Sequence, residues 1–482
     1  MLLTLFPAER PEYPEGAPEG DRAELSFFEG EKRDTAVCRL VLGGECFSGR
    51  ASVSRAEMTD DLTRARLTQR AVSLSFYRAA LASGIEKPVW GSLTGIRPGK
   101  LMSRLLEQGL SDRAAVTEFV RLYDADRARA ELCLHTAHAG LAVEKSLTPR
   151  DVCLYVGIPF CPTRCAYCSF VSISVQKSMK RIPDYLAALD REIEATAAAV
   201  KKLGLRPVAL YMGGGTPTTL SAPQLDALCT KLEEAFDLTA LREYTVEAGR
   251  PDTITREKLE ALKKHGVTRV SVNPQTMDDA VLEAIGRKHT AADVLTALSE
   301  VRRTGGFAVN MDLIAGLPAD TPERFDHTLE TVLALAPENI TVHTLALKKG
   351  SGIMRGETPV PDARAVGGMI GAANAALFAA GYRPYYLYRQ KYMSGGFENV
   401  GWQKGGTESL YNICIMEELC SILALGGGGS TKLCTGGGRI ERVFDPKYPD
   451  EYIAGIDRIA ADKDKIVQLL APSLGAGLQE DE

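Results

Sequence analysis

Six short β-branched runs alternate with longer amphipathic segments between residues 152 and 382, and this alternation limits the folds open to the chain. Such a pattern is typical of successive β-α units around a parallel sheet, as a barrel or an open doubly wound sheet. Strands of this kind are buried on both faces, so polar chemistry gathers at their carboxyl ends. The predicted strands span residues 152–159, 207–215, 243–249, 269–275, 308–317 and 339–347. We therefore expect an α/β core over residues 151–382.

The segments on either side differ from this core. Residues 1–150 begin with a short mixed stretch and continue with helical patterns, which indicates an α-rich or α+β N-terminal accessory domain. Residues 383–470 form a smaller C-terminal extension, which we expect to cover the substrate, and residues 471–482 are a polar tail expected to be disordered. The run GGGGSTK at 426–432 is expected to be a native turn.

Composition excludes several classes of protein. The net charge of -5 and 25% charged residues give no basic excess for nucleic-acid binding. The sequence also contains no run of 18 apolar residues, the length needed to span a membrane. The start of the chain lacks the basic leader of a signal peptide, so we expect a cytoplasmic protein whose thiols stay reduced. Eight scattered cysteines are then expected to be small buried apolar residues: Cys38, Cys46, Cys133, Cys153, Cys229, Cys414, Cys420 and Cys434.

Three further cysteines stand close together just past the first predicted strand. Cys161, Cys165 and Cys168 lie in a loop where a strand-end site should be. A structural zinc ion needs four ligands, and no histidine or fourth cysteine follows nearby. Three thiolates instead suit a 4Fe–4S cluster in which one iron is left open for another ligand. Structural zinc or merely buried thiols remain the alternatives.

Other strand ends also carry candidate ligand residues. The motif GGGTPT at 213–218 follows the second strand, and its glycines let the backbone approach a ligand closely, although a tight turn before a helix would use the same residues. A buried carboxylate needs a partner, so Glu247 and Asp312 are expected to face hydroxyls or cations. A structural ion pair between Asp312 and Arg269 is the alternative. Asn273 and Gln275 end the fourth strand.

The Cys-x3-Cys-x2-Cys spacing resembles the radical S-adenosylmethionine (SAM) superfamily. This resemblance implies a partial (β/α)6 barrel, a 4Fe–4S cluster held by the three cysteines, and SAM bound to its open iron. An electron from the cluster then cleaves the sulfonium to methionine and a 5'-deoxyadenosyl radical. The resemblance assigns no catalytic residue beyond the cluster and SAM.

The order of motifs narrows this resemblance to the oxygen-independent coproporphyrinogen III oxidase family. The motifs are YxxIPFCxxxCxYC, GGGTPT, VEAGRPD, RVSVNPQT, GRKHT and NMDLIAGLP, and the flanking WGSLTGIRPGKL and PYYLYRQKYMSGGFENVGW are similar to its HemZ-type coproporphyrinogen dehydrogenase branch. Family roles then imply that SAM is bound by Tyr155, Gly214, Gly215, Thr216, Glu247, Gln275, Arg287 and Asp312. Gln275 matches a contact to a second SAM, although Asn273-Pro274 replaces the usual Gly-Val before it.

The family's substrate would be flat, largely apolar and tetra-anionic. The implied reaction oxidatively decarboxylates two propionates of coproporphyrinogen III to vinyl groups, giving protoporphyrinogen IX in porphyrin and heme biosynthesis. Its pocket should combine aromatic walls with cations that bind carboxylates. The stretches LKKGS and YRPYYLYRQKY offer both kinds of residue, and the candidate substrate residues are Lys348, Arg383, Tyr388, Arg389 and Lys391.

Two other functions within the radical SAM superfamily are competing hypotheses for this chain. A heme chaperone would keep the cluster and bind heme without turnover, and a radical SAM methyltransferase or ring-opening enzyme would act on heme itself. Decarboxylating relatives carry a fourth cysteine two residues after the third, where this chain has Phe170, as heme chaperones do. Each hypothesis implies a tetrapyrrole ligand, and turnover implies an electron donor such as flavodoxin or ferredoxin. His343 is expected to be a hydrogen-bonded core residue.

Overall fold

The computed structural model describes residues 1–6, 9, 12, 19–168, 173–174, 179–346, 359–390 and 394–475. Two compact units divide the chain. The first contains residues 1–96, 104–134 and 395–397, and the second contains residues 97–103, 135–394 and 398–482. The predicted domain boundaries at residues 150 and 382 remain predictions.

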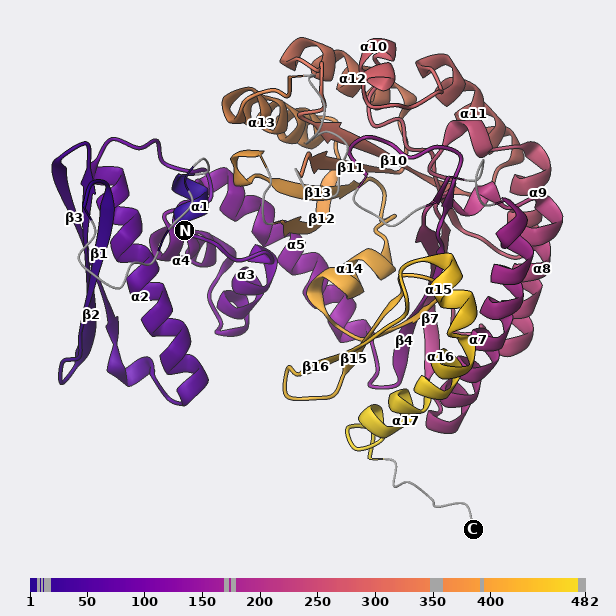
Figure 1. Cartoon of the computed structure of the whole chain (residues 1–482), viewed down its shortest axis with the longest axis horizontal. Helices are drawn as coiled ribbons and strands as arrows, with labels where there is room; N and C mark the ends of the chain where they lie inside the picture. Colours follow the sequence, from indigo (N-terminus) through magenta and orange to yellow (C-terminus); the bar gives the residue numbers. More distant parts are fainter. Residues whose placement is uncertain are drawn as a thin grey trace. The chain divides into compact units, whose positions relative to one another are not determined.

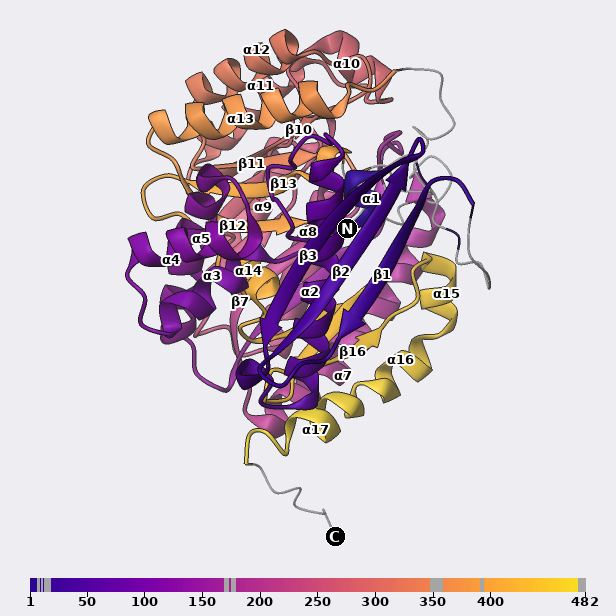
Figure 2. The ribbon, with the colours of Figure 1, turned by 90° about the vertical axis from the view of Figure 1, so that its left-hand side faces the viewer.

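The first unit is built on an antiparallel sheet of β1 (Arg22–Phe28), β2 (Arg33–Leu42) and β3 (Glu45–Ser54), in that order. Figure 2 shows the three strands side by side with α2 (Asp61–Ala82) along them. Buried residues alternate along β2 and β3, and α2 packs on that face. Helix α4 (Asp112–Tyr123) begins at the capping residue Ser111 and ends at Asp124. Asp124 accepts a hydrogen bond from the Tyr77 hydroxyl at 2.7 Å.

The second unit contains the predicted parallel sheet. All six predicted strands are confirmed and lie side by side in sequence order, each parallel to the next. They are β4 (Asp151–Ile158), β7 (Arg206–Gly214), β8 (Glu243–Val246), β9 (Arg269–Ser271), β10 (Ala308–Ala315) and β11 (Asn339–Thr344). The sheet is open, because the outer neighbours of β4 and β11 are β14 and β13.

Helices follow these strands as predicted and lie along the outer side of the sheet (Figure 1). Ser221 and Thr321 cap α8 and α12 by accepting hydrogen bonds from the backbone N–H of Gln224 and Arg324. The helices are α7 (Ile182–Leu203), α8 (Ala222–Ala235), α9 (Arg256–Lys264), α10 (Asp279–Ala284), α11 (Ala291–Thr304), α12 (Pro322–Leu335) and α13 (Ala363–Ala379).

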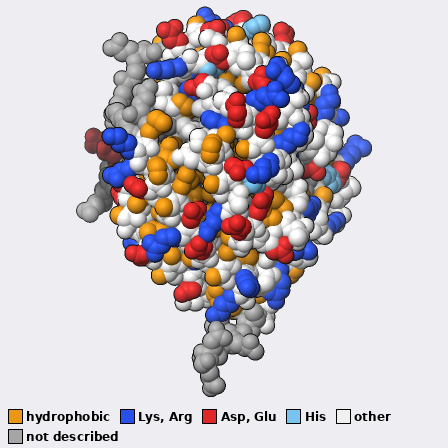
Figure 3. All heavy atoms as spheres, turned by 90° about the vertical axis from the view of Figure 1, so that its right-hand side faces the viewer, with side chains coloured by type: hydrophobic (Ala, Val, Ile, Leu, Met, Phe, Trp, Pro, Cys, Tyr) orange, Lys and Arg blue, Asp and Glu red, His pale blue; other side chains and the backbone are white. Residues whose placement is uncertain are grey.

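The outward faces of these helices are polar, and Figure 3 shows acidic and basic side chains interspersed on one such side of the molecule. Ion pairs at the surface join neighbouring helices. Lys231 on α8 pairs with Glu194 on α7, and Lys264 on α9 pairs with Asp226 on α8. No helix in the described part of the chain is both long and apolar enough to cross a membrane.

Strands from the C-terminal region extend the sheet at both edges. β13 (Glu398–Gln403) pairs antiparallel with β11, and β12 (Arg383–Arg389) pairs with β13. At the other edge β14 (Ser421–Leu425) runs parallel to β4, followed by the antiparallel β15 (Ser430–Cys434) and β16 (Ile440–Phe444). Helices α14 (Leu410–Glu417), α15 (Pro449–Ala454), α16 (Ile456–Asp462) and α17 (Asp464–Leu470) complete this region. Of the predicted tail, residues 476–482 lie outside the described residues.

The glycine run between β14 and β15 is a turn, as predicted. Gly426 has a φ of +93°, and a Cβ there would lie 2.5 Å from the backbone oxygen of Gly157. A Cβ on Gly429 would lie 2.7 Å from the carboxylate of Asp445. The turn therefore requires glycine at both positions, because it packs directly on the end of β4.

A buried ionic network holds this turn in place. Glu192 on α7 accepts a hydrogen bond from the Gly426 N–H at 2.7 Å and forms an ion pair with Lys463. Lys463 also lies 3.6 Å from Asp445, and burial beside Glu192 raises the pKa of Asp445 to about 8. Tyr452 donates its hydroxyl hydrogen bond to Glu192. The network joins the C-terminal helices to α7 and to the end of β4.

We expect Lys463→Ala to lower the free energy of unfolding by about 3 kcal/mol, because it leaves two buried acids without their cation. Lys465→Ala, which removes an exposed pair with Asp462, is the matched control and should change the value by less than about 0.5 kcal/mol. Urea unfolding of the full chain measures both, and equal effects would contradict a structural role for the network.

Candidate functional site

The three motif cysteines lie in a loop at the carboxyl end of β4, as predicted. Cys161 ends the short strand β5 (Phe160–Cys161), and all three side chains are partly buried. The loop is fastened to the barrel because the Ala166 N–H donates to the Ile285 carbonyl at 3.0 Å. It also turns on itself through a hydrogen bond from the Cys168 N–H to the Cys165 carbonyl at 3.1 Å.

Two buried guanidinium groups lie beside this loop. Arg250 donates to the Thr163 hydroxyl at 2.9 Å, lies 4.0 Å from the Cys165 sulfur, and is held by a two-pronged pair with Asp252. Arg287 donates to the Tyr167 hydroxyl at 3.0 Å and to a backbone carbonyl at 2.7 Å. Two cationic groups therefore lie beside the loop that carries the three motif cysteines.

The glycine motif fastens the end of β7 to the same loop. The Gly215 N–H donates to the Ile158 carbonyl at 2.8 Å, and the Thr216 N–H donates to the Phe160 carbonyl at 2.8 Å. The Thr216 hydroxyl lies 3.5 Å from the Cys161 sulfur. We expected the glycines to free the backbone for a ligand, but these two amides are already used within the protein. A Cβ on Gly215 would lie 2.6 Å from the Phe160 oxygen, so close strand packing requires glycine there.

Glu247 follows β8 and lies among tyrosines. Its carboxylate accepts a hydrogen bond from the Tyr211 hydroxyl. The Tyr211 ring is 4.4 Å from that of Tyr411 and 6.4 Å from that of Tyr155, all nearly parallel. Burial, which the hydrogen bond offsets only in part, raises the pKa of Glu247 to about 7. A group with this pKa can either accept or donate a hydrogen bond near neutral pH.

Asp312 on β10 has the opposite electrostatic character. Burial disfavours its charge, but hydrogen bonds from His343, Asn310 and Thr341 outweigh burial and lower the pKa of Asp312. The Asn310 amide lies 2.8 Å and the His343 Nε2 3.8 Å from the carboxylate. His343 therefore faces Asp312 from the neighbouring strand, but its side chain is 27% exposed, so the prediction that it is a core residue is wrong.

The alternative partner for Asp312, Arg269, is engaged elsewhere. Arg269 bonds the Asn339 side chain and the Thr407 carbonyl and lies 4.0 Å from Glu243. The alternative ion pair between Asp312 and Arg269 is therefore not formed, and the role of Asp312 in ligand binding stays a prediction.

Gln275 has an unusual backbone for a residue with a side chain, with a φ of +68°. Gln275 is buried, and its N–H donates a hydrogen bond to the Asp312 carbonyl at 2.9 Å. Its carbonyl accepts a hydrogen bond from the Ile314 N–H at 3.0 Å, so the pairing of β9 with β10 continues to this residue. The preceding Asn273 accepts a hydrogen bond from the Asp312 N–H at 3.2 Å. Strained backbone of this kind persists where neighbouring structure fixes it, and it is common at functional sites.

The predicted substrate residues are brought to the site only in part. Tyr386 and Tyr388 on β12 stack with ring centres 6.3 Å apart, and the Tyr386 hydroxyl lies 3.4 Å from Thr341, beside Asp312. Arg389 is buried at the end of β12. Arg383, at the start of this strand and about 20 Å away, is exposed and contacts the Phe378 ring. Lys348, Lys391 and Phe170 lie outside the described residues.

Buried polar atoms without partners show where a bound group would fit. Among the residues that the structure describes, the Arg287 Nε and both ring nitrogens of His289 are buried with no hydrogen-bond partner. Burial, with Arg287 and Arg250 nearby, lowers the pKa of His289 to about 4, so its ring is neutral. These groups lie beside the cysteine loop, and together with three partly buried thiols they suit a 4Fe–4S cluster and a polar ligand of it.

Several site residues could not be found from motifs alone. Tyr211 and Tyr411 reach the site through packing between distant segments, and the sequence gives no spacing that joins them. Arg250 lies in the motif VEAGRPD, but the motif alone assigned it no contact with the cysteine loop. A second group of cysteines, Cys153 and two others, was expected to be scattered buried thiols but converges in space.

Comparisons with known proteins agree with this arrangement. Residues 155–332 match the Radical SAM superfamily. The oxygen-independent coproporphyrinogen-III oxidase-like protein HemZ of Bacillus subtilis (strain 168) is 38% identical over 385 residues, which cover 79% of this chain and 77% of HemZ. Heme chaperone HemW of the same organism is 37% identical over 195 residues, which cover 40% of this chain and half of HemW.

The fold is also similar to a solved structure. Coproporphyrinogen III oxidase (HemN) from Escherichia coli, a radical SAM enzyme, superimposes with a TM-score of 0.54 and 24% identity, covering 69% of this chain and 78% of that structure. The likeness confirms the predicted radical SAM fold.

We expect Glu247→Gln to change how stability depends on pH. Folding raises the pKa of Glu247 from its usual range to about 7, so the folded state binds a proton more tightly. Wild type therefore loses stability as pH rises from 5 to 8, and the variant should lose about 2 kcal/mol less. Urea unfolding of the cluster-free protein at both values measures this. The exposed Glu330→Gln should follow wild type, and a Glu247→Gln slope equal to wild type would disprove the shift.

We expect Gly215→Ala to lose at least half of the iron and sulfide that reconstitution loads. Its Cβ would meet two backbone oxygens of the cysteine loop, which must then move. Gly368→Ala, where a Cβ meets open space within α13, should load normally. Full loading of Gly215→Ala would contradict the coupling between the two loops.

Proposed function

We propose that this chain oxidatively decarboxylates coproporphyrinogen III. The premise is that the chain belongs to the radical SAM superfamily and, within it, to the family of the oxygen-independent coproporphyrinogen-III oxidase-like protein HemZ. Its cofactors are a 4Fe–4S cluster and SAM. The proposal for the substrate is carried by one observation, the stacked Tyr386 and Tyr388 beside Asp312 inside the barrel.

The chain's own residues have distinct proposed tasks. Cys161, Cys165 and Cys168 would hold the cluster, which with SAM supplies a 5'-deoxyadenosyl radical when both are bound. Glu247 and Asp312 differ in pKa and could accept hydrogen bonds from the ribose hydroxyls of SAM or from its methionyl ammonium group.

The tyrosines would shape the remaining space. Tyr155, Tyr211 and Tyr411 form a nearly parallel group that excludes water beside Glu247. Tyr386 and Tyr388 offer a flat apolar wall of the kind that a tetrapyrrole ring packs against. Each propionate would lose a hydrogen atom from its β-carbon and then carbon dioxide, with one electron passing to an acceptor, to leave a vinyl group.

We expect reconstituted protein with SAM and reductant to form 5'-deoxyadenosine, and Cys165→Ala to reduce this by at least 100-fold. Cys229→Ser, at a buried cysteine on α8, is the matched control and should retain the activity. Quantifying 5'-deoxyadenosine by chromatography gives the result, and undiminished cleavage in Cys165→Ala would refute the cluster assignment.

The substrate is tested by anaerobic incubation with coproporphyrinogen III, SAM and reductant. We expect products lacking one and then two carboxyl groups. Tyr388→Ala should turn the substrate over at least 10-fold more slowly, but it should form 5'-deoxyadenosine at the wild-type rate when no substrate is present. SAM cleavage that yields no decarboxylated product would reject this substrate while leaving the radical chemistry intact.

A heme chaperone is the second candidate, favoured by the likeness to HemW over 195 residues. His343 lies partly exposed beside Asp312 and is an imidazole that could bind heme iron. This candidate is supported if heme binds stoichiometrically, if His343→Ala weakens binding at least 10-fold, and if coproporphyrinogen III is not consumed. Optical titration of heme into the same samples separates the two functions.

A further inference from the structure

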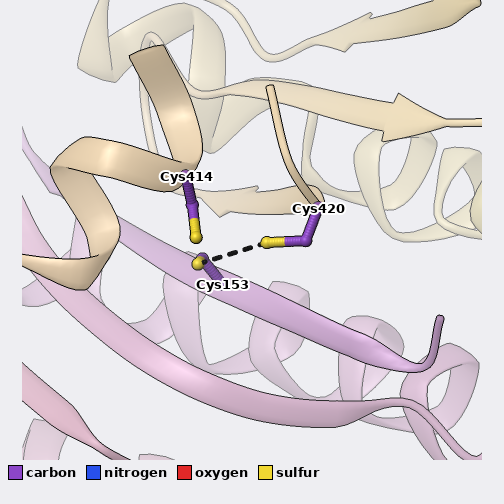
Figure 4. Close-up of side chains that lie close together, drawn as sticks. All are labelled: Cys153, Cys414 and Cys420. Carbon is purple, nitrogen blue, oxygen red and sulfur yellow. Dashed lines mark hydrogen bonds between the residues drawn. The ribbon is translucent and has the colours of Figure 1, made fainter. Parts of the chain in front are cut away.

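Cys153, Cys414 and Cys420 come from three separate elements and point their sulfur atoms toward one another (Figure 4). Cys153 lies on β4, Cys414 on α14 and Cys420 just before β14. The three sulfur atoms all lie within 4.8 Å of one another, and those of Cys153 and Cys420 are 3.6 Å apart. Residues separated by more than 250 positions in sequence thus form one compact group of thiols.

This group, which we call the inner cysteine triad, is separate from the motif cysteines. Cys153 stands eight residues before Cys161, and along an extended strand this corresponds to about 25 Å. The triad is buried in a cluster that also contains Val208, Ile413 and Ile422. Water is excluded from this region, so a charged ion there would be bound by sulfur alone or with one small extra ligand.

The sulfur separations fit a single metal ion. Bonds of about 2.3 Å between zinc and thiolate place the sulfur atoms of a tetrahedral site about 3.8 Å apart. Distances between 3.6 and 4.8 Å require shifts of less than about 1 Å to reach this value. A disulfide needs about 2.05 Å, which is a larger change, and ligands of a multi-iron cluster bind different irons and stand farther apart.

The three thiols lie together in otherwise apolar surroundings. Those of Cys153 and Cys420 contact each other at 3.6 Å, and the Cys414 sulfur lies within 4.8 Å of both. Merely apolar packing would not require three sulfur atoms from separate elements to converge. Soft thiolates select thiophilic d10 ions such as Zn(II) and Cu(I) over hard cations.

We propose that the inner cysteine triad binds one thiophilic d10 ion per chain, Zn(II) or Cu(I), as a structural site that ties α14 and β14 to β4. Binding displaces the thiol protons, forms metal–sulfur bonds and involves no change of oxidation state. The ion would join the first parallel strand to two elements that follow it by more than 250 residues.

The test uses full-length protein in which Cys161, Cys165 and Cys168 are all changed to serine, so that no iron–sulfur cluster interferes. Samples are kept reduced and anaerobic, and are titrated separately with Zn(II) and with Cu(I) against a competing chelator. We expect one ion per chain for at least one of the two metals, bound through three sulfur atoms by X-ray absorption. The arm that saturates identifies the ion.

Variants in this background locate the site. Cys414→Ser should weaken binding at least 10-fold, and Cys229→Ser, at a buried cysteine outside the triad, should not. Cys420→Ser, at the least buried position of the triad, repeats the test if Cys414→Ser does not fold by circular dichroism. Substoichiometric binding of both ions, equal affinity in the triad variants, or a Cys153–Cys420 disulfide in intact mass spectra of reduced protein would overturn the proposal.

Discussion

Two backbone hydrogen bonds past the ends of β4 and β7 hold the cysteine loop and the glycine loop together. The Gly215 and Thr216 N–H groups bond the Ile158 and Phe160 carbonyls, so the cysteine loop and the glycine loop form one layer above the sheet. The close approach excludes any side chain at Gly215. Arg250 and Arg287, which follow neighbouring strands, both interact with Cys165 of this loop.

Inside this layer the protein separates two carboxyl groups by their surroundings. Glu247 lies among tyrosine rings, and burial raises its pKa, whereas hydrogen-bond donors on β10 and β11 lower the pKa of Asp312. One group can therefore be neutral while the other is anionic, although both line the same interior. A ligand that carries hydroxyls, a cation and an apolar ring would meet a different kind of surface at each.

The sequence predicted the fold well because the six β-α units are encoded by local periodicity and by caps such as Ser221. Thr255 stands at the N-cap position of α9, but its side chain makes no capping hydrogen bond to the backbone. The cysteine loop was predictable because its three ligands are close in sequence. The tyrosine group, the role of Arg250 and the inner cysteine triad were not, because their members meet only through the order of strands in the sheet. Arg383 and Arg389 were predicted together because basic and tyrosine residues are dense in this stretch of sequence. That density does not show that the two arginines lie at opposite ends of β12.

The position of β14 beside β4 has a consequence for how this chain folds. β4 gains its partner β7 about 50 residues later, but its other edge waits for β14, which is synthesised about 270 residues after it. Contacts of such long sequence separation form slowly, and an unpaired edge of a buried strand can pair with another chain in the meantime. The central strand that leads into the cysteine loop is therefore the part of the barrel most exposed to misassembly during synthesis. The C-terminal fifth of the chain, although far from the strand-end loops in sequence, completes that strand's environment.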